Sequence, residues 1–410
     1  MANSGKFELL APAGDMEKLK SALHFGADAV YLGGENFGLR KASKNFSREE
    51  LEEAVRYAHA KGAAIHVTTN ILPHDNDLDG LKDYALFLES IGVDAVIVSD
   101  PGIFMAFRNN TQMEIHVSTQ ASITSSDTVN FWADLGAKRL VLARELSLKE
   151  IRKIRENSYD DVDLECFVHG AMCISYSGRC LLSNYMTGRD ANQGDCAQAC
   201  RWKYHLMEEK REGEFYPIGE DGGGTFILNS KDLCLLPYMS DLMDAGIRSF
   251  KIEGRVKTAF YVACVVKAYR QAIDAALEGK LDEGLVDDLM RELAKTSHRD
   301  FTSGFLFGNP GLGGQNYDTT SYIQDYDFIG LVKEVDEKGG RILVQCRNKF
   351  AEGDEVEMVR AKGHNLTFLI SNIEDQEGSR QEEAKVPMED FWIPLEESCQ
   401  VGDMVRRRKN

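Results

Sequence analysis

Long apolar runs are missing from this sequence: Asp94, Asp100 and Pro101 interrupt the best candidate, so no segment reaches the length of a membrane span. The first residues, MANSGKFELLAPAG, lack the charged, apolar and small-residue regions of an export signal. Basic residues are scarce too, because 48 of them stand against 66 acidic residues and leave a net charge of −18. We therefore expect a soluble, cytoplasmic protein without a membrane partner. Its charge argues against broad contact with the phosphates of a nucleic acid.

Signatures of several enzyme classes are absent as well. The sequence contains no HExxH, GxSxG, GxxxxGK[ST] or GxGxxG motif, which disfavours a metalloprotease, a serine hydrolase, a P-loop NTPase and a dinucleotide-binding enzyme. A cysteine protease would need a reactive thiol paired with a base, and His169 near Cys173 is the only local candidate in the sequence. Peptidase activity is therefore a minor alternative.

Cysteine, in contrast, is concentrated in one segment. Of the nine cysteines, five lie between Glu165 and Cys200 and another follows at Cys234. In a cytosolic protein such clusters more often bind metal or do redox work than form disulfides. The spacing lacks the paired CxxC motifs of a structural zinc site, and irregular all-thiolate ligation favours an iron–sulfur cluster. Zinc and inert thiols remain the alternatives.

A short apolar strand alternates with an amphipathic helix from residue 8 to about residue 255. A glycine closes the helix just before a strand at five junctions, for example Gly92-Val-Asp-Ala-Val-Ile-Val, because glycine suits the left-handed position that ends a helix. The capping boxes Ser47-x-x-Glu50 and Ser147-x-x-Glu150 mark two helix starts. The predicted strands lie near 8–12, 29–32, 64–68, 95–98, 114–118, 139–142, 163–168 and 249–252. Eight such units indicate an α/β fold with a TIM-type (β/α)8 barrel, and an open doubly wound sheet is the alternative.

The interval between the seventh and eighth strands is far longer than an ordinary connection and contains the cysteines. We predict a barrel domain over residues 1–300 with a cysteine-rich insertion at 169–248, in which 208–224 is a polar hairpin or loop and a helix begins at Asp232. A Gly-rich linker at 301–325 leads to short alternating strands, which indicate a small antiparallel β-barrel at 326–410. We interpret its basic end, Arg406 to Lys409, as a solvated tail rather than an RNA contact.

The insertion leaves the barrel at the carboxyl end of the seventh strand, on the rim where TIM barrels hold their active sites. Polar residues at other strand ends share this rim and become candidates by location: His66, Asn70, His116, Gln120, Arg144, His169, Lys251, Glu253 and Arg255. The three histidines and Glu253 are the catalytic candidates. Buried histidines that bond to a neighbour explain the three histidines equally well.

Cationic and aromatic residues are the candidates for substrate binding. The guanidinium groups of Arg144 and Arg255 suit a carboxylate or a phosphate, although a salt bridge to a neighbouring glutamate is the simpler explanation. Lys251, Asn70 and Gln120 would assist them. Arg179 and Arg189 lie beside cysteines and could meet an anion or serve structure only. The aromatic residues Tyr176, Tyr185 and Trp202 could stack on a flipped-out base, although core packing around the thiols is the simpler reading.

The segment Glu165-Cys-Phe167-Val-His-Gly170-Ala-Met-Cys173-Ile-Ser-Tyr-Ser-Gly178-Arg-Cys180 resembles the signature of the collagenase-like peptidase family, the peptidase U32 family. The continuation NYMTGRDANQGDCAQACRW is similar to the branch of that family that hydroxylates RNA. Within the branch it looks most like the prephenate-dependent tRNA hydroxylation proteins, which make 5-hydroxyuridine at the wobble position.

The resemblance implies tRNA as substrate and prephenate as co-substrate or ligand. It also implies a 4Fe–4S cluster on Cys173, Cys180, Cys196 and Cys234, with Cys200 as a spare thiol. Ribosomal RNA as substrate, a non-catalytic subunit that works with a paralogous protein, and a collagenase-like peptidase are the alternatives to tRNA hydroxylation.

Overall fold

The structure, a computed structural model, describes residues 7–38, 45–173, 175–201, 219–221, 224–226, 230–310, 314 and 322–409. No helix in this part of the chain is both long enough and apolar enough to cross a membrane.

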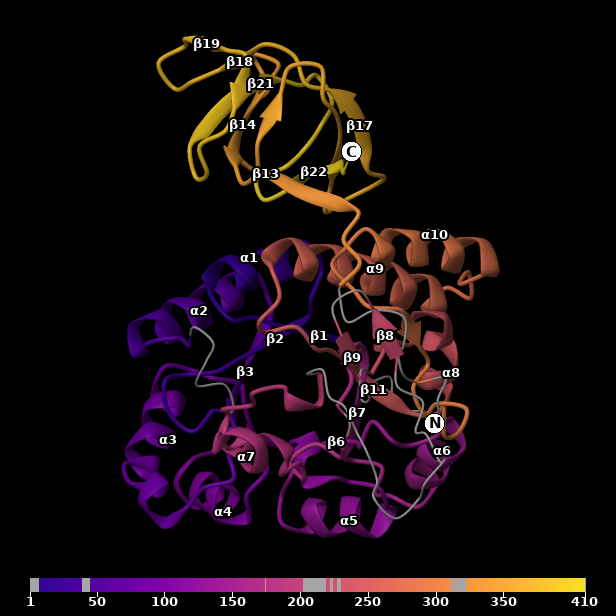
Figure 1. The fold of residues 1–410 in the computed structure, drawn as a ribbon. Coiled ribbons are helices and arrows are strands. Elements are labelled where there is room, and N and C mark those ends of the chain that lie inside the picture. Colours follow the sequence, from indigo (N-terminus) through magenta and orange to yellow (C-terminus); the bar gives the residue numbers. More distant parts are fainter. Residues whose placement is uncertain are drawn as a thin grey trace.

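The first domain is a closed barrel of parallel strands (Figure 1). Its strands, in spatial order, are β1 (Glu8–Pro12), β2 (Ala29–Leu32), β3 (Ala64–Thr69), β4 (Ala95–Val98), β5 (Glu114–Val117), β6 (Arg139–Val141), β7 (Asp163–Ala171) and β11 (Ile247–Ile252). The sheet closes because β11 pairs in parallel with both β7 and β1. The predicted TIM-type barrel is confirmed.

Helices surround this barrel on the outside (Figure 1). They are α1 (Met16–His24), α2 (Arg48–Ala60), α3 (Leu81–Ser90), α4 (Pro101–Asn110), α5 (Ser126–Asp134), α6 (Leu148–Glu156), α8 (Met239–Asp244), α9 (Ala259–Leu277) and α10 (Glu283–Ala294). The capping boxes at Ser47 and Ser147 are both formed, so their side chains start α2 and α6 as predicted. Gly92 ends α3 with φ 84°, a left-handed conformation that a side chain would strain.

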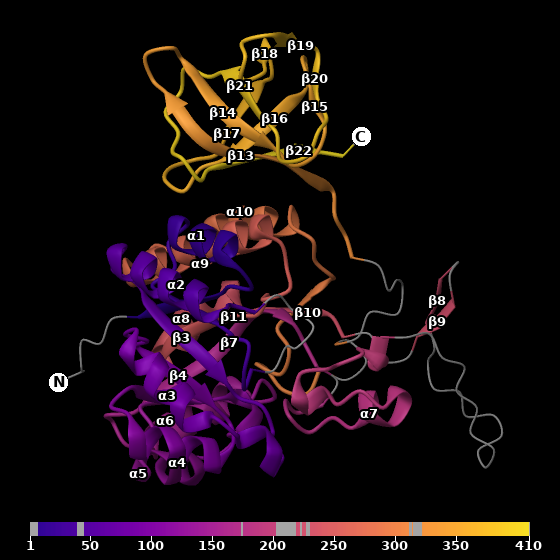
Figure 2. The ribbon, with the colours of Figure 1, turned by 90° about the vertical axis from the view of Figure 1, so that its left-hand side faces the viewer.

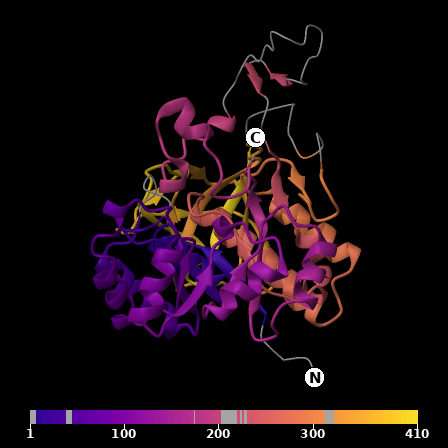
Figure 3. The ribbon, with the colours of Figure 1, turned by 90° about the horizontal axis from the view of Figure 1, so that it is seen from below.

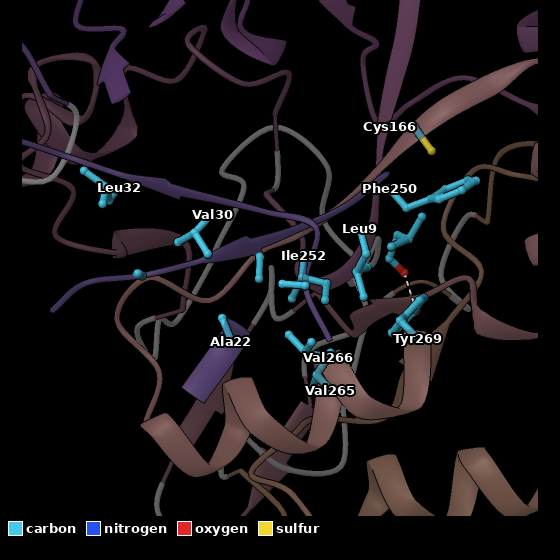
Figure 4. Close-up of a cluster of buried hydrophobic side chains, with 14 of the residues drawn as sticks. Leu9, Ala22, Val30, Leu32, Cys166, Phe250, Ile252, Val265, Val266 and Tyr269 are labelled. Carbon is cyan, nitrogen blue, oxygen red and sulfur yellow. Dashed lines mark hydrogen bonds between the residues drawn. The ribbon is translucent and has the colours of Figure 1, made fainter. Parts of the chain in front are cut away.

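The main hydrophobic core lies between the strands and the helices. Leu9, Val30 and Ile252 point outward from their strands toward Val265 and Val266 of α9 (Figure 4), and all five are fully buried. Burial on this outer layer leaves the opposite side of each strand to face the barrel interior, because successive side chains of a strand alternate.

The insertion after β7 contains short elements beside the carboxyl ends of the barrel strands. They are α7 (Leu182–Thr187), the 3-10 turns Ala191–Gln193 and Ala199–Arg201, a β8–β9 hairpin (Gly219–Asp221, Gly224–Phe226) and β10 (Asp232–Cys234). Figure 2 shows α7 projecting from this end of the barrel. The expected helix from Asp232 is wrong at its start, because β10 runs antiparallel to β7 and pairs with β12 (Phe301–Thr302) before a 3-10 turn (Leu236–Tyr238) leads into α8. Trp202 and residues 208–218 lie outside the described residues.

The second domain is a curled antiparallel sheet that sits against α1, α9 and α10, beside the barrel wall (Figures 1 and 2). Its strands are β13 (Tyr326–Asp336), β14 (Arg341–Cys346), β15 (Phe350–Ala351), β16 (Glu355–Val359), β17 (Leu366–Leu369), β18 (Ile373–Glu374), β19 (Arg380–Gln381), β20 (Glu383–Ala384), β21 (Asp390–Pro394) and β22 (Met404–Arg408). The order β17-β16-β22-β13-β14-β21-β18-β19 forms the main sheet.

Arg406, the first residue of the basic end, belongs to the domain interface and not to a solvated tail. Arg406 lies in β22 and its side chain is fully buried. Its guanidinium is 2.6 Å from the carboxylate of Glu292 in α10 and 2.7 Å from that of Glu357 in β16. The stacked rings of Phe260 and Phe328 add an apolar contact across the same interface. The expectation of a solvated tail is therefore wrong for Arg406, whereas Arg408 and Lys409 are exposed.

Candidate active site at the barrel mouth

A cavity of about 400 Å³ lies where the strand ends meet the insertion. Barrel residues contribute Tyr31, Thr68, Asn70, Ser118, Gln120, Arg144, Phe167, Lys251, Glu253, Arg255 and Lys257, and the insertion contributes Cys173, Ser177, Cys180, Ser183, Asn192, Cys196 and Cys200. Figure 3 shows α7 beyond the edge of the barrel when the molecule is viewed from below. The cavity therefore combines residues that lie far apart in the sequence.

Hydrogen bonds fasten the insertion to the loops of the barrel. Arg144 donates from Nη1 to the carbonyl of Ala171 at 2.9 Å and from Nη2 to the hydroxyl of Ser177 at 2.8 Å. The backbone N–H of Leu72, in the loop after β3, donates to the carbonyl of Asn192 at 3.0 Å. Arg144 thus lines the cavity, but its guanidinium binds the insertion. It does not form the salt bridge to a neighbouring glutamate that was the simpler explanation.

The charge of the cavity wall is positive although the protein is acidic. Among the described lining residues, the cations Arg144, Lys251, Arg255 and Lys257 face a single carboxylate, that of Glu253. Arg255 donates to the hydroxyl of Thr68 at 3.3 Å and to the amide oxygen of Asn45 at 3.1 Å. A wall of this kind attracts a small anion with carboxylate or phosphate groups.

Two glycines leave room for Arg255 and Glu253 at the mouth of the cavity. A Cβ on Gly33 would lie 2.4 Å from Nη2 of Arg255, so only glycine leaves space for the guanidinium. Gly170 has φ 111°, and a Cβ there would lie 2.6 Å from the carbonyl oxygen of Glu253. The hydroxyl of Tyr31 donates to the Ile252 carbonyl at 2.9 Å and contacts the Glu253 carboxylate at 3.4 Å. These contacts fix Glu253 and Arg255 at the mouth.

Below the cavity the barrel interior holds a buried ionic network. Nζ of Lys251 is 2.8 Å from Oε1 of Glu165, and both side chains are almost inaccessible to solvent. The other oxygen of Glu165 accepts from the Ser249 hydroxyl at 2.9 Å and from Arg139 at 3.4 Å. Burial raises the pKa of Glu165, but the nearby charges of Lys251 and Arg139 lower it by more than burial raises it. The net shift of this pKa is downward. Glu165 therefore stays ionised beside Lys251 at the floor of the cavity.

The three predicted catalytic histidines do not line the cavity. His66 and His116 meet inside the barrel with ring centroids 4.8 Å apart, and burial lowers the pKa of each. His169 points outward, where Nδ1 is 3.3 Å from the Tyr269 hydroxyl, and burial lowers its pKa to about 3. Contrary to the prediction, all three are buried neutral histidines away from the mouth, and Glu253 is the predicted catalytic residue that does line it.

Four cysteine thiols share the cavity: those of Cys173, Cys180, Cys196 and Cys200. Cys234, the fourth ligand implied by the resemblance, is not among the lining residues. Its sulfur contacts the Tyr269 hydroxyl at 3.7 Å and the Met290 sulfur at 3.6 Å, and burial raises its pKa to about 11. Within the described part of the chain, no group of three or more His, Cys, Asp or Glu side chains is placed to hold a metal ion.

Of the remaining candidates, Asn70 and Gln120 line the cavity, whereas Arg179 and Arg189 do not. Arg189 is paired with Asp195 at 2.7 Å on the surface of the insertion. The sequence reasoning missed Lys257, whose Nζ lies 3.8 Å from the centre of the Tyr322 ring. Its position just after β11 was the available signal, because strand ends supply the residues of this face.

The fold and the site define a TIM-barrel protein whose strand ends and cysteine-rich insertion enclose a cationic, thiol-lined cavity. Residues 14–316 match peptidase family U32, and residues 324–406 match the peptidase family U32 C-terminal domain. The chain therefore belongs to peptidase family U32.

Three relatives show how far the similarity extends. The chain is 42% identical over 405 residues to tRNA hydroxylation protein P1 of Bacillus subtilis (strain 168), and the aligned region covers 98% of this chain and 95% of the relative. It is 36% identical over 439 residues to tRNA hydroxylation protein P of Escherichia coli (strain K12), covering 97% and 95%. It is 38% identical over 327 residues to the 23S rRNA 5-hydroxycytidine C2501 synthase of Escherichia coli (strain K12), covering 78% of this chain and 48% of that protein.

Proposed function

We propose that this protein is an RNA hydroxylase that converts the wobble uridine of tRNA to 5-hydroxyuridine. The observation that carries the proposal is the cavity at the barrel mouth, where four thiols, one carboxylate and several cations are brought together in a chain similar over nearly its full length to proteins named for tRNA hydroxylation. A similarity to a ribosomal RNA synthase points to the same class of reaction on another RNA.

We propose that the thiols hold an iron–sulfur cluster. The donor set fits in kind, because all-thiolate ligation is typical of such clusters and four thiols line one cavity. The proposal requires the insertion to draw these thiols closer together than they lie in the structure. When bound, the cluster would supply electrons or a Lewis-acidic iron beside the substrate.

Three of the ligands in this proposal are Cys173, Cys180 and Cys196. The fourth position has two candidates with different support, Cys200 by its place in the cavity and Cys234 by the resemblance. Iron content of the purified Cys200→Ser and Cys234→Ser variants separates them, since only the ligand's variant loses iron. Equal iron in both variants and the wild type would remove both from the ligand set.

We propose prephenate as the co-substrate, bound by the residues that line the cavity. A dicarboxylate suits the cationic wall, where Arg255 and Lys257 line the cavity without fastening the insertion, and Lys251, paired with Glu165, lies at its floor. Tyr31 and Phe167 place aromatic rings beside Lys251, at 4.6 and 5.5 Å from its nitrogen, and offer an apolar surface to the ring of such a ligand. Glu253, held by Tyr31, is the residue we assign to proton transfer.

The peptidase alternative finds no support at the site. Its one local pair required His169 to act as a base for Cys173, but His169 packs against Tyr269 and Phe301 on the outer side of β7. We therefore do not propose peptidase activity, whatever the name of the family.

The experiment that tests the function is nucleoside mass analysis of tRNA. Cells that lack their own tRNA hydroxylation protein would carry either this gene or its Cys180→Ser variant. We expect 5-hydroxyuridine with the wild type and none with the variant. Absence of the product with the wild type would overturn the proposal, and a product that forms only with an added second protein would identify a non-catalytic, paired subunit.

A further inference from the structure

Large apolar side chains are exposed together on the insertion. Tyr185 is 86% exposed, Leu181 71%, Tyr176 44% and Met186 40%. Scattered apolar residues are common on protein surfaces, but several within one short segment mark a binding surface. We call these four residues the insertion lip. Core packing around the thiols, the simpler reading of Tyr176 and Tyr185 in the sequence, does not describe them.

The insertion lip borders the cavity. Tyr176 directly precedes Ser177, which lines the cavity, and Leu181 stands between two further lining residues, Cys180 and Leu182. Tyr185 and Met186 follow in α7, which begins at Leu182. A molecule that reaches into the cavity from outside therefore passes over this surface.

Size and charge together favour one kind of occupant. A cavity of about 400 Å³ can admit one nucleotide but not a folded RNA loop, so a modified base must be turned out of its strand while its neighbours stay at the lip. Aromatic side chains suit these neighbours because every base offers a flat face for stacking. Arg179, exposed in the same segment, adds a cation.

The charge of the protein makes stacking more important than phosphate contact. With a net charge of −18, the chain cannot gain most of its RNA affinity by neutralising phosphates. Arg189, the other arginine of the segment, is already paired with Asp195. Stacking on aromatic side chains supplies affinity that does not depend on the net charge of the protein.

We propose that Tyr185 and Tyr176 of the insertion lip stack on the unpaired nucleotides that flank the base entering the cavity. The inference rests on the proposed function, because that function supplies the RNA. Beyond that function, the inference identifies the residues that position the RNA and the kind of contact that binds it.

The test measures binding of the full-length protein to a fluorescently labelled RNA hairpin with the sequence of a tRNA anticodon arm. Tyr185→Ser should weaken binding at least about fivefold, the effect of losing one stacked base, whereas Tyr185→Phe should bind like the wild type. The salt dependence of binding should be the same in Tyr185→Ser and the wild type, because no phosphate contact is lost. Tyr159→Ser is the matched control, since Tyr159 is 45% exposed but precedes β7 at the opposite end of the barrel.

The outcomes separate this inference from the function on which it rests. Equal binding of the hairpin by Tyr185→Ser and the wild type would overturn the stacking role, while tRNA hydroxylation by the wild type in cells would still support the function. A wild type that neither binds the hairpin nor forms 5-hydroxyuridine would overturn both. If Tyr185→Ser changed the oligomeric mass of the protein but not its RNA affinity, the insertion lip would be a protein interface and the inference would be wrong.

Discussion

Replacing Lys251 by methionine removes the positive charge that faces Glu165 in the centre of the barrel. The two groups are 2.8 Å apart, and their side chains are 5% and 1% exposed. Methionine has a similar length and is apolar, so the change removes a charge with little loss of volume. Glu165 would then keep the hydroxyl of Ser249 and the more distant guanidinium of Arg139 as partners.

The expected cost follows from the burial of this pair. Breaking a buried ion pair by removal of one partner costs about 3–5 kcal/mol, because the other charge remains without water. The remaining contacts of Glu165 place the value for Lys251→Met near the lower end, at about 3 kcal/mol. Lys280 and Glu278 form a control pair at 2.7 Å on the surface, where Lys280→Met should change the stability far less, because water solvates both charges.

The same variant should show a distinct pH dependence. In the wild type the pKa of Glu165 is lowered, so its contribution to stability is present above the pKa of the unfolded chain and is lost as the pH falls through the lower folded value. Without Lys251, burial raises the pKa of Glu165, and the carboxyl can take up a proton at mildly acidic pH. The stability difference between Lys251→Met and the wild type should therefore be larger at pH 7.5 than at pH 5.

Urea unfolding of the two proteins at both pH values measures these differences. Addition of Glu165→Gln to Lys251→Met should recover part of the lost free energy of unfolding, because a neutral amide no longer needs a counter-charge. If Lys251→Met unfolded like the wild type at pH 7.5, or if its deficit grew as the pH fell, the buried pair would not have the role described.

Two further predictions concern the domain interface and the cavity. Arg406→Met should lower the apparent Tm by about 5–10 °C in a thermal scan, since it leaves the carboxylates of Glu292 and Glu357 without their buried cation. Arg408→Met, at an exposed residue, should change the Tm little. Equal Tm values for Arg406→Met and the wild type would contradict the described interface. Gly33→Ala should displace the Arg255 guanidinium and reduce 5-hydroxyuridine in tRNA nucleosides without unfolding the protein. Gly284→Ala in α10 should not, because its Cβ would make only an ordinary contact, 3.5 Å from a carboxylate oxygen of Asp282. Undiminished product with Gly33→Ala would contradict a role for Arg255.

Most of the barrel could be predicted from the sequence because its signals are local. Apolar strands, helix-ending glycines and capping serines repeat in each unit, and the predicted strands coincide with the observed ones to within a few residues. In the strands of the second domain, apolar and polar residues alternate with the period of two that is expected for a sheet. The contacts of Arg406 could not be predicted, because its partners Glu292 and Glu357 come from two separate regions of the chain.

The candidate site was predictable in location but not in detail. Strand ends correctly indicated Asn70, Lys251, Glu253 and Arg255 as residues of the mouth. Alternation along β7 would place His169 on the same side as Phe167, but the pairing of β7 with β11 shifts register between Lys251 and Ile252, and His169 faces outward instead. A bulge of this kind has no signal in a single sequence. The fourth cysteine likewise depends on how the insertion folds back, which spacing does not determine.

Iron and acid-labile sulfide in the anaerobically purified full-length protein test the central claim most directly, when they are measured on the same preparation that is shown to form 5-hydroxyuridine. The account predicts about four irons and four sulfides per chain, as a cluster on four thiolates requires, and their loss in Cys180→Ser. An iron-free wild-type preparation that still hydroxylates tRNA would contradict it.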